Sequence, residues 1–385
     1  MSDTTADFLS GQGVPVALHD LEAELFRLWG PATEQAGGPA VENPNVTRVV
    51  LTNLVMFAKQ SDAARLLGVL DMVASRYPSR TIVLQRTEGL GRKIETEVSA
   101  LCHLPAPGQT PVCSERILLK FGPEASDMLP GAVRPILEPE LPFVLWWTDD
   151  PRNDEALYFD LADECTRLIL DLPDLDTDTA ALRLGLDPKH CAHARDTAWF
   201  GLFRWRELIA QFFDPSCHLA TISKIAGVKI EVAVPGKPAA IPPRLAVWLA
   251  AWLAGQLGWK PAGKPDRQVG LLKATFTSEA GPIALEIVTD SSNDPSDVVA
   301  RLRATTITTR AAEGIEPSLF RLGRPSLHDP EVRVKIDSST YCSLPKTLLA
   351  PQPDHAQRVA AALESSRNDP PFKNAIPHAF WLLEG

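Results

Sequence analysis

Two short clusters carry residues suited to metal or redox chemistry. His190-Cys191-Ala192-His193 places three potential metal ligands within four residues. A zinc site of this kind needs a fourth ligand and usually a second cluster. The sequence shows neither, so we expect an ordinary surface helix start and no metal site. Cys102-His103 and Cys113 lie on neighbouring expected strands. Two interpretations stay open for these thiols, a thiol–thiol switch and, favoured, plain buried cysteines.

Lys59-Gln60-Ser61 is the one segment placed to bind an anion. It follows an expected strand and begins an expected helix, at the carboxyl edge of a parallel sheet. Ligands usually bind at this edge, and a helix N-terminus favours phosphate. No glycine opens the backbone here, so an ordinary helix cap by Ser61 is the favoured interpretation. Lys59 and Ser61 remain candidate anion-binding residues, with Asp149 at the same edge.

The sequence contains no convincing catalytic motif. G-x-S-x-G, H-E-x-x-H and the phosphate-binding P-loop are all absent. Gly11-Gln12-Gly13 has no strand before it, so a dinucleotide-binding interpretation fails on context. We therefore expect no catalytic residue and no cofactor.

The run Glu140–Trp147 ends in two adjacent indoles, Trp146 and Trp147. Successive strand residues point to opposite faces, so each layer beside the sheet receives one indole. A strand that is apolar on both faces is typical of the covered centre of an α/β fold. Anchoring of the core is the favoured interpretation, and the alternative is that one indole is exposed to a partner.

The first half of the chain alternates strands and helices. Val49–Phe57 predicts a buried strand, the helix after Ser61 carries an apolar stripe, and Thr81–Leu84 predicts the next strand. Such a unit implies a right-handed parallel crossover. Further strands are expected at Glu97–Leu104, Glu115–Phe121 and Arg167–Leu172.

A long helix is expected from Asp196, as its cap, to Phe213. Apolar residues cover most of its surface, and Arg204, Glu207 and Gln211 form its polar strip. Arg206 lies among the apolar residues and therefore needs a carboxylate or carbonyl partner.

The pattern changes after residue 220. A strand at Val228–Val234, a helix after Pro242-Pro243 and a hairpin of Val269–Phe276 with Pro282–Thr289 are expected. The fold class is thus an α/β N-terminal domain with a mostly parallel sheet covered by helices, followed by an α+β C-terminal domain with an antiparallel sheet. We expect an N-terminal helix and loop at residues 1–45, the α/β domain at 46–220 and the α+β domain at 221–385, because 385 residues exceed one ordinary core.

Composition narrows the choice of partners. A formal net charge of −10 argues against nucleic acid. The most apolar window, Leu245–Leu257, is shorter than the roughly 20 residues that span a bilayer, so we expect a buried helix and no membrane. Residues 1–30 lack a secretory signal.

The six cysteines show no paired motif and are expected to be free thiols of a cytoplasmic protein.

Several segments resemble one family, the OpcA-type glucose-6-phosphate dehydrogenase assembly proteins. These segments follow the order of the family over residues 45–260: Thr47–Val55, Tyr77–Leu84, Cys113–Ile117, Leu141–Trp147, Arg204–Gln211, Trp248–Leu253 and Leu257–Trp259. The family often has histidine at the position of Tyr77 and aspartate at that of Glu140. Both differences from the family are mild, and the first weakens any role for a titrating group at position 77.

The resemblance implies a non-catalytic cytoplasmic protein of the oxidative pentose phosphate pathway. Such a protein would bind glucose-6-phosphate dehydrogenase, favour its active oligomer and raise its apparent substrate affinity. Candidate contacts with this partner are Arg80, Trp146, Trp147, Arg204 and Glu207. The alternative is a sugar-phosphate-binding enzyme or sensor that uses Lys59, Ser61 and Asp149.

Overall fold

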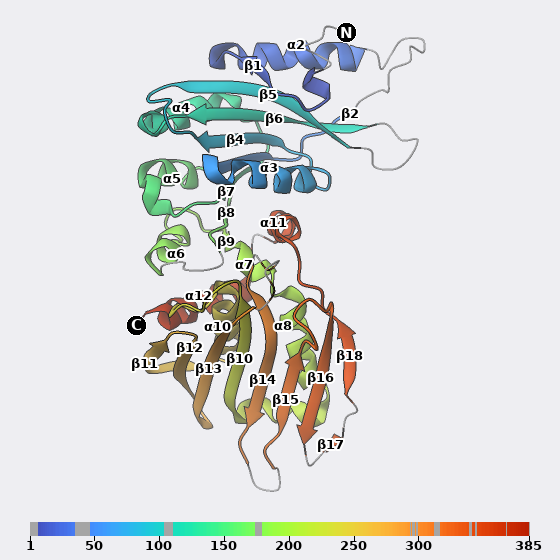
Figure 1. Ribbon diagram of the computed structural model, residues 1–385, viewed down its shortest axis with the longest axis vertical. Coiled ribbons are helices and arrows are strands. Elements are labelled where there is room, and N and C mark those ends of the chain that lie inside the picture. The colour runs from blue at the N-terminus through green and yellow to red at the C-terminus, as the bar shows by residue number, and fades with distance from the viewer. Residues whose placement is uncertain are drawn as a thin grey trace. The chain divides into compact units, whose positions relative to one another are not determined.

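The structure is a computed structural model, and it describes most of the 385-residue chain. The described residues are 7–34, 47–103, 111–173, 179–292, 294, 297, 299–311, 316–338, 341–342, 345–366 and 368–384. They form two compact units that interleave along the sequence (Figure 1). Unit 1 comprises Met1–Leu172, Leu184–Thr197 and His355–Arg367, and unit 2 comprises Pro173–Arg183, Ala198–Asp354 and Asn368–Gly385. The contiguous boundaries expected from the sequence stay a prediction.

Unit 1 is built on a mostly parallel sheet of nine strands within the described residues. Eight strands follow the order β1-β5-β6-β4-β3-β7-β8-β9, and β2 also pairs with β6. The strands from β6 to β9 in this order are parallel, whereas β1 and β5 are antiparallel to their neighbours. The expected mostly parallel sheet is confirmed.

The strands of this sheet are β1 (Val14–Val16), β2 (Thr47–Arg48), β3 (Asn53–Lys59), β4 (Arg80–Arg86), β5 (Ile94–His103), β6 (Val112–Phe121), β7 (Phe143–Trp147), β8 (Arg167–Leu170) and β9 (Ala194–Asp196). The helices of unit 1 are η1 (Leu18–Asp20), α2 (Leu21–Glu34), α3 (Gln60–Ala74), η3 (Pro123–Met128), α4 (Leu129–Val133), η4 (Arg134–Ile136), η5 (Pro151–Asp154), α5 (Glu155–Ala162) and α11 (His355–Glu364).

Strand β7 lies at the centre of this sheet, between β3 and β8. All five of its residues are buried because helices cover both faces. Trp146 packs edge to face on His355 of α11, whereas Trp147 packs edge to face on Tyr158 of α5. Each layer therefore receives one indole, and the prediction of core anchoring is confirmed.

One predicted helix cap and one predicted helix length are wrong. Helix α3 begins at Gln60 after Lys59, and no side chain caps it, so Ser61 already lies within the helix. Asp196 ends strand β9 and directly precedes α7, so the helix begins where expected, but it is not one long helix. The expected long helix is divided into α7 (Thr197–Phe200), α8 (Phe203–Ala210) and η6 (Gln211–Phe213).

Unit 2 is built on a mostly antiparallel sheet, again of nine strands within the described residues. Its order is β11-β12-β13-β10-β14-β15-β16-β17, and β18 pairs with β16. The pairing of β10 with β13 is parallel, and the other pairings are antiparallel. The expected antiparallel sheet is confirmed for this half of the chain.

The strands of unit 2 are β10 (Ile225–Val234), β11 (Lys260–Gln268), β12 (Leu271–Ser278), β13 (Gly281–Ser291), β14 (Arg301–Thr309), β15 (Leu319–Gly323), β16 (Glu331–Ser338), β17 (Tyr341–Cys342) and β18 (Lys346–Leu349). Its other helices are α6 (Thr179–Gly185, which ends in unit 1), α9 (Ser216–Leu219), η7 (Ile222–Lys224), α10 (Arg244–Gln256) and α12 (Pro370–Leu383).

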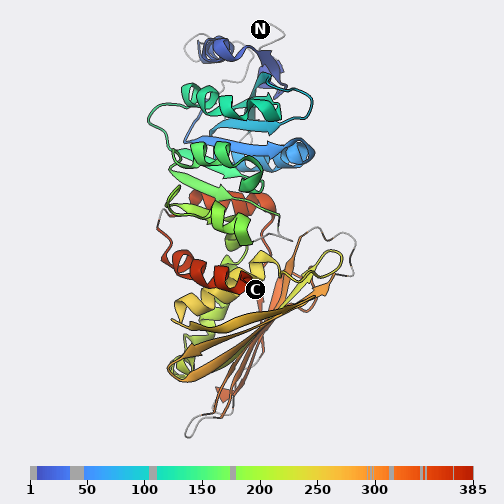
Figure 2. The same cartoon turned by 90° about the vertical axis from the view of Figure 1, so that its left-hand side faces the viewer.

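Helices α10 and α12 pack together beside this sheet (Figure 2). A side chain at Gly255 of α10 would place its Cβ only 2.6 Å from the carbonyl oxygen of Asn374, so glycine permits the close approach. Helix α10 is mostly buried, as its apolar sequence predicts. Among the described residues, none of the helices has the length and hydrophobicity required to cross a membrane.

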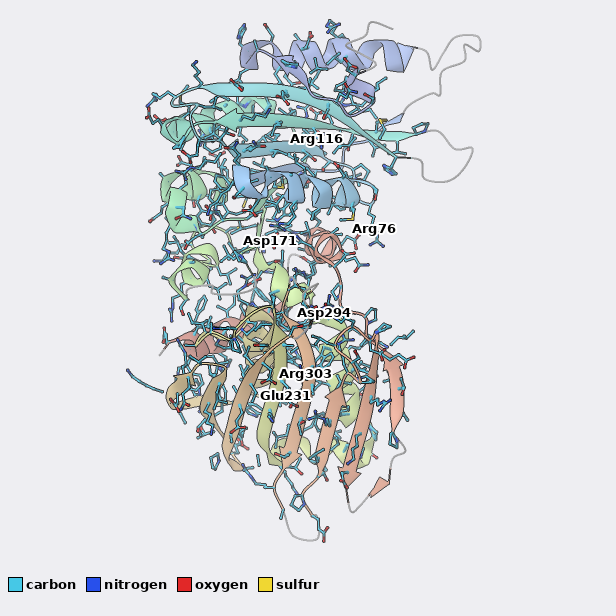
Figure 3. All side chains as sticks on the ribbon, viewed as in Figure 1. Arg76, Arg116, Asp171, Glu231, Asp294 and Arg303 are labelled. Atoms are coloured by element: carbon cyan, nitrogen blue, oxygen red, sulfur yellow. A yellow bond between two sulfur atoms is a disulfide. The ribbon has the colours of Figure 1, made fainter. Side chains whose placement is uncertain are left out.

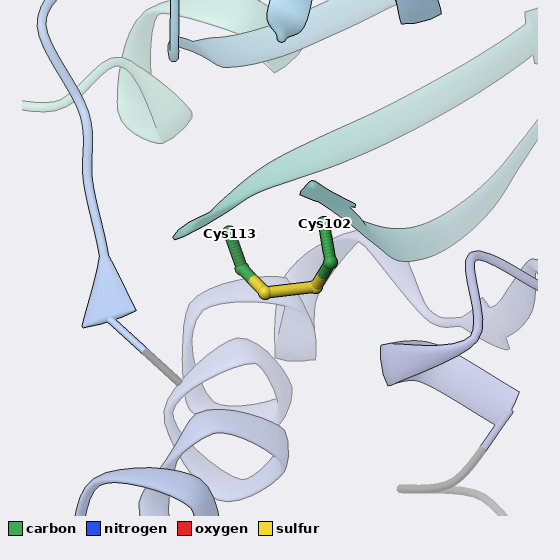
Figure 4. The surroundings of a disulfide bond; sticks show 2 residues. All are labelled: Cys102 and Cys113. Carbon is green, nitrogen blue, oxygen red and sulfur yellow. A yellow bond between two sulfur atoms is a disulfide. The ribbon is translucent and has the colours of Figure 1, made fainter. Parts of the chain in front are cut away.

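Cys102 and Cys113 form a disulfide between β5 and β6 (Figure 4). The expectation that all the cysteines are free is therefore wrong for this pair. The antiparallel register places the two residues directly opposite each other, with Cα atoms 4.1 Å apart. That separation brings the two sulfur atoms within bonding reach. Cys165 and Cys191 are free, as expected, and the side chains of Cys217 and Cys342 lie outside the described residues.

We expect Cys102→Ser to lower the free energy of unfolding by roughly 2–3 kcal/mol, because the disulfide closes a short loop in the unfolded chain. Guanidinium denaturation with and without a thiol reductant measures this effect. Cys165→Ser is the matched control, and its response to reductant should equal that of the wild type. Equal stability of the reduced and non-reduced wild type would contradict the prediction.

Candidate functional site

The parallel strands of unit 1 bring their carboxyl ends to one edge of the sheet. From β3, the chain proceeds outward through β4 to β6 on one side and from β7 through β8 to β9 on the other. The order therefore reverses between β3 and β7. In doubly wound folds, ligands bind in the crevice at such a reversal. This edge is the first place to look for a site.

A cavity of about 670 Å³ opens at this edge. It is lined by Lys59, Gln60, Ser61, Arg86, Glu88 and Asn153. The structure thus brings together the two candidate anion-binding residues, Lys59 and Ser61. Sequence reasoning missed Arg86 and Asn153, although Arg86 ends β4 and the carboxyl-edge rule applied to that strand would have found it.

The cations of this edge are already neutralised by carboxylates. Lys59 Nζ lies 2.5 Å from Asp149 Oδ1, and Arg86 lies 3.9 Å from Asp154. Asn153 Nδ2 also donates to Asp149, at 3.1 Å. A phosphate would have to compete with these carboxylates for both cations, so the cavity is polar without being a ready anion site.

The residues do not fit a dinucleotide, the group that a doubly wound sheet often binds. Such a cofactor needs glycines between the first strand and its helix, so that the pyrophosphate can approach the backbone. Here β3 passes directly into α3 through Lys59 and Gln60, and Asp62 adds a negative charge to the first helical turn. Phe57 and Trp147 lie opposite each other on β3 and β7 and stack at 4.1 Å between ring centroids, so they fill part of the layer beside the sheet.

Three of the five candidate contact residues are buried, and the other two lie at the surface. Trp146 and Trp147 are both fully buried, so the condition that one indole be exposed is not met. Arg80 has an exposed fraction of 3%. Arg204 and Glu207 remain at the surface of α8, where they form an ion pair of 2.5 Å with each other. That Arg204 and Glu207 contact a partner protein stays a prediction.

Arg80 belongs to a buried ion network that holds the N-terminal helix. Its Nε donates to Glu115 at 2.5 Å and its NH1 donates to Glu22 of α2 at 2.8 Å. Trp29 of α2 and Arg48 also donate to Glu115. Burial alone would raise the pKa of Glu115, but the charges of Arg80 and Arg48 hold it below its usual value. The structural interpretation of Arg80 therefore accounts for its contacts.

The exposed surface around Arg204 includes two large apolar side chains that the sequence analysis did not single out. Phe203 is 68% exposed and lies one helical turn before Glu207. Arg204 Nε donates to the carbonyl of Leu349, at 3.0 Å, and Leu349 is itself 62% exposed. We call Phe203, Arg204, Glu207 and Leu349 the α8 surface. Exposed apolar groups within a charged rim are typical of protein contact sites.

Arg206 has an aromatic partner in place of the predicted carboxylate or carbonyl. Its guanidinium lies over the ring of Trp199, 3.6 Å from the ring centroid. Burial lowers the pKa of Arg206 to about 10, and the charge of Asp369 opposes this shift. Trp199 Nε1 donates to Asp369 at 3.0 Å, so the indole connects cation and carboxylate. The face of an indole satisfies a buried cation in a way that spacing alone cannot reveal.

His190-Cys191-Ala192-His193 forms turns before β9 and not the expected surface helix start. Cys191 lies with its sulfur 3.6 Å from that of Cys165, and His190 lies 2.7 Å from a carboxylate oxygen of Asp163. Within the described residues, no group of three or more potential ligands is arranged to hold a metal ion.

Asp171 is a buried carboxylate of this unit (labelled in Figure 3). Trp146 Nε1 and Thr197 Oγ1 donate to it, and His355 Nε2 lies 2.6 Å from its Oδ2. Burial would raise the pKa of Asp171, but the hydrogen bonds and the charge of His355 hold it well below its usual range. This pair ties α11, which comes from the far end of the sequence, to the carboxyl end of β8.

Two family models match this chain. The model described as the glucose-6-phosphate dehydrogenase subunit N-terminal domain matches residues 70–184, and the model of the C-terminal domain matches residues 192–376. The two matches together cover more than half of the chain.

Curated relatives with the same family name also match. The chain is 28% identical over 193 residues to a putative OxPP cycle protein OpcA of Synechococcus elongatus, which covers 50% of this chain and 42% of the relative. A protein of the same name from Nostoc punctiforme is 29% identical over 195 residues, which covers 50% of this chain and 41% of the relative. The matched region thus spans less than half the length of these relatives.

Solved structures show only a distant likeness. A glucose-6-phosphate dehydrogenase in complex with its substrate has a TM-score of 0.45 at 9% identity, over 87% of this chain and 92% of that chain. A myo-inositol dehydrogenase from Lactobacillus casei has a TM-score of 0.38 at 9% identity, over 82% and 83%. Nothing about function follows from likenesses of this size.

We expect Asp171→Asn to lower the free energy of unfolding at pH 7 by about 2–4 kcal/mol, because it breaks a buried charged pair. The pKa of Asp171 is lower in the folded protein than in the unfolded chain, so the stabilisation is complete above the unfolded value of about 4 and is lost as pH falls below it. Denaturation at pH 7, 5 and 3 should therefore show the gap between wild type and variant narrowing at pH 3.

Asp163→Asn is the matched control, because Asp163 also faces a histidine but is exposed. This substitution should lower the free energy of unfolding by no more than about 1 kcal/mol at pH 7. A gap between wild type and Asp171→Asn that stays constant from pH 7 to pH 3 would refute the assignment.

Proposed function

Because the chain belongs to the OpcA family of glucose-6-phosphate dehydrogenase assembly proteins, we propose that it is a non-catalytic cytoplasmic subunit that binds this dehydrogenase. In this role it favours the active oligomer and raises the apparent affinity for glucose 6-phosphate. The observation that carries the proposal is the pair of family matches, which run through both units. The edge of unit 1 supports it, since Lys59 is paired with Asp149 there and no glycine separates β3 from α3.

Activation of this kind needs no chemistry by the subunit. A protein that binds only the active form of an enzyme shifts the population towards that form by the difference in binding free energy. A tenfold shift corresponds to about 1.4 kcal/mol. One well-placed apolar side chain at an interface supplies this much.

The α8 surface is the contact with the dehydrogenase in our proposal. Phe203 and Leu349 are among the most exposed large apolar residues of the described chain. Arg204 and Glu207 lie beside them and neutralise each other, so they form a polar rim without net charge. An exposed aromatic anchor within such a rim has the composition of an interface hot spot.

The first test mixes the purified chain with purified glucose-6-phosphate dehydrogenase. We expect a larger species in sedimentation velocity and a severalfold lower half-saturating concentration of glucose 6-phosphate, because the bound form of the enzyme is the active one. The chain alone should show no turnover. Absence of a complex together with unchanged kinetics would refute the proposal.

The second test replaces Phe203 by Asp. The change should weaken binding to the dehydrogenase at least tenfold, since it places a charge where an apolar anchor is buried. Phe26→Asp is the matched control, because Phe26 is 81% exposed and lies on α2 of the other unit. Binding curves by interferometry measure both. Equal affinity of the Phe203→Asp variant and the wild type would show that the contact does not involve α8. The result of the first test would still stand.

A sugar-phosphate enzyme or sensor is the second candidate, and the cavity of about 670 Å³ at the edge of unit 1 is the observation in its favour. It predicts that glucose 6-phosphate binds to the isolated chain and that Lys59→Gln abolishes the binding. The ion pair of Lys59 with Asp149 argues against this candidate.

A further inference from the structure

One pocket of unit 2 gathers cations in a chain whose formal net charge is −10. It has a volume of about 380 Å³ and lies where β15 and β16 run side by side. Its lining residues are Arg321, Gly323, Arg324, Pro325, Arg333, Val334, Lys335 and Pro345. Four of the eight are basic, and none is acidic.

The strand register forces these cations together. Arg321 of β15 lies directly opposite Lys335 of β16, and Gly323 lies opposite Arg333. Residues two apart on a strand point to the same face, so Arg333 and Lys335 share one side of the sheet. Like charges placed opposite each other in a sheet are destabilising. Because Gly323, opposite Arg333, has no side chain, the face of the sheet at this position stays open.

The carboxylates nearby balance only part of this charge. Arg321 NH1 lies 2.8 Å from Glu231 of β10, which Figure 3 labels on the same sheet. Lys335 reaches Asp337 only at 3.8 Å, with both side chains exposed. Such an exposed ion pair contributes little to the free energy of folding. Within the described residues, Arg333 has no ion pair and no hydrogen bond.

Arg324 also lines the pocket, but its guanidinium lies 5.3 Å from the ring centroid of buried Trp205, on the other face of the sheet from Arg321. It donates to two carbonyl groups, those of Asp329 and Ala350, which carry no net charge. Burial and the like charge of Arg301 lower the pKa of Arg324, and Asp329 opposes this only in part. An anion in the pocket would relieve the opposition of like charges between Arg321 and Lys335.

We propose that this pocket binds a small phosphate ester. Guanidinium and ammonium groups that share one face are the usual ligands of a phosphate dianion. Pro325 and Pro345 supply an apolar rim for the organic part of the ester. The volume of about 380 Å³ lies within the range of small-molecule sites. This site differs from the cavity at Lys59 and does not depend on the proposed partner.

The test is isothermal titration calorimetry of the full chain with inorganic phosphate and with glucose 6-phosphate as the representative ester. We expect the ester to bind at least tenfold more tightly than inorganic phosphate and with an affinity that falls as sodium chloride is raised. The double variant Arg333→Gln/Lys335→Gln should weaken ester binding at least tenfold. Both residues are exposed, so we expect the variant to fold, and its circular dichroism and melting temperature check this.

Two further variants decide the location. Lys273→Gln removes a lysine from β12 of the same sheet, outside the pocket, and should leave binding unchanged. Binding that is lost in Lys59→Gln but kept in the double variant would place the ester at unit 1 and overturn the proposal. No heat with either probe up to millimolar concentrations, or equal binding by the folded double variant, would also overturn it.

Discussion

The burial of β7 on both faces is the constraint on which unit 1 depends. Trp146 enters one layer, where its Nε1 donates to Asp171, and Trp147 enters the other, where it stacks on Phe57. A central strand with an indole on each side needs helices on both faces, and α11 and α5 supply them. Because α11 comes from residues beyond 354, the first unit is complete only when the second half of the chain has been made.

The edge of this sheet lacks the features that let such a topology bind a dinucleotide. In a doubly wound sheet the crevice at the strand reversal is open and lined with backbone groups that receive a ligand. Here a cavity of about 670 Å³ remains at the edge, but β3 passes into α3 without a glycine and Lys59 pairs with Asp149. The strand order is that of a ligand-binding sheet, but the residues at its edge do not fit a dinucleotide, which is consistent with a subunit that works through its surface.

The sequence predicted the elements whose signal is local and missed the features that depend on register. The apolar run of β7 and the strand–helix–strand unit of β3, α3 and β4 follow from local patterns. The disulfide between Cys102 and Cys113 requires β5 and β6 to pair in one register, which no local pattern specifies. The same limit applies to Arg206, whose partner Trp199 lies on the preceding helix, and to Arg333, whose cationic neighbours come from another strand.

Unit 2 places the proposed anion pocket beside the proposed partner surface. Arg324 of the pocket donates to the carbonyl of Ala350, and Arg204 of the α8 surface donates to the carbonyl of the preceding residue, Leu349. Both arginines therefore hold one short segment after β18. If an anion in the pocket changes the affinity for the partner, linkage requires that the partner change the affinity for the anion by the same factor.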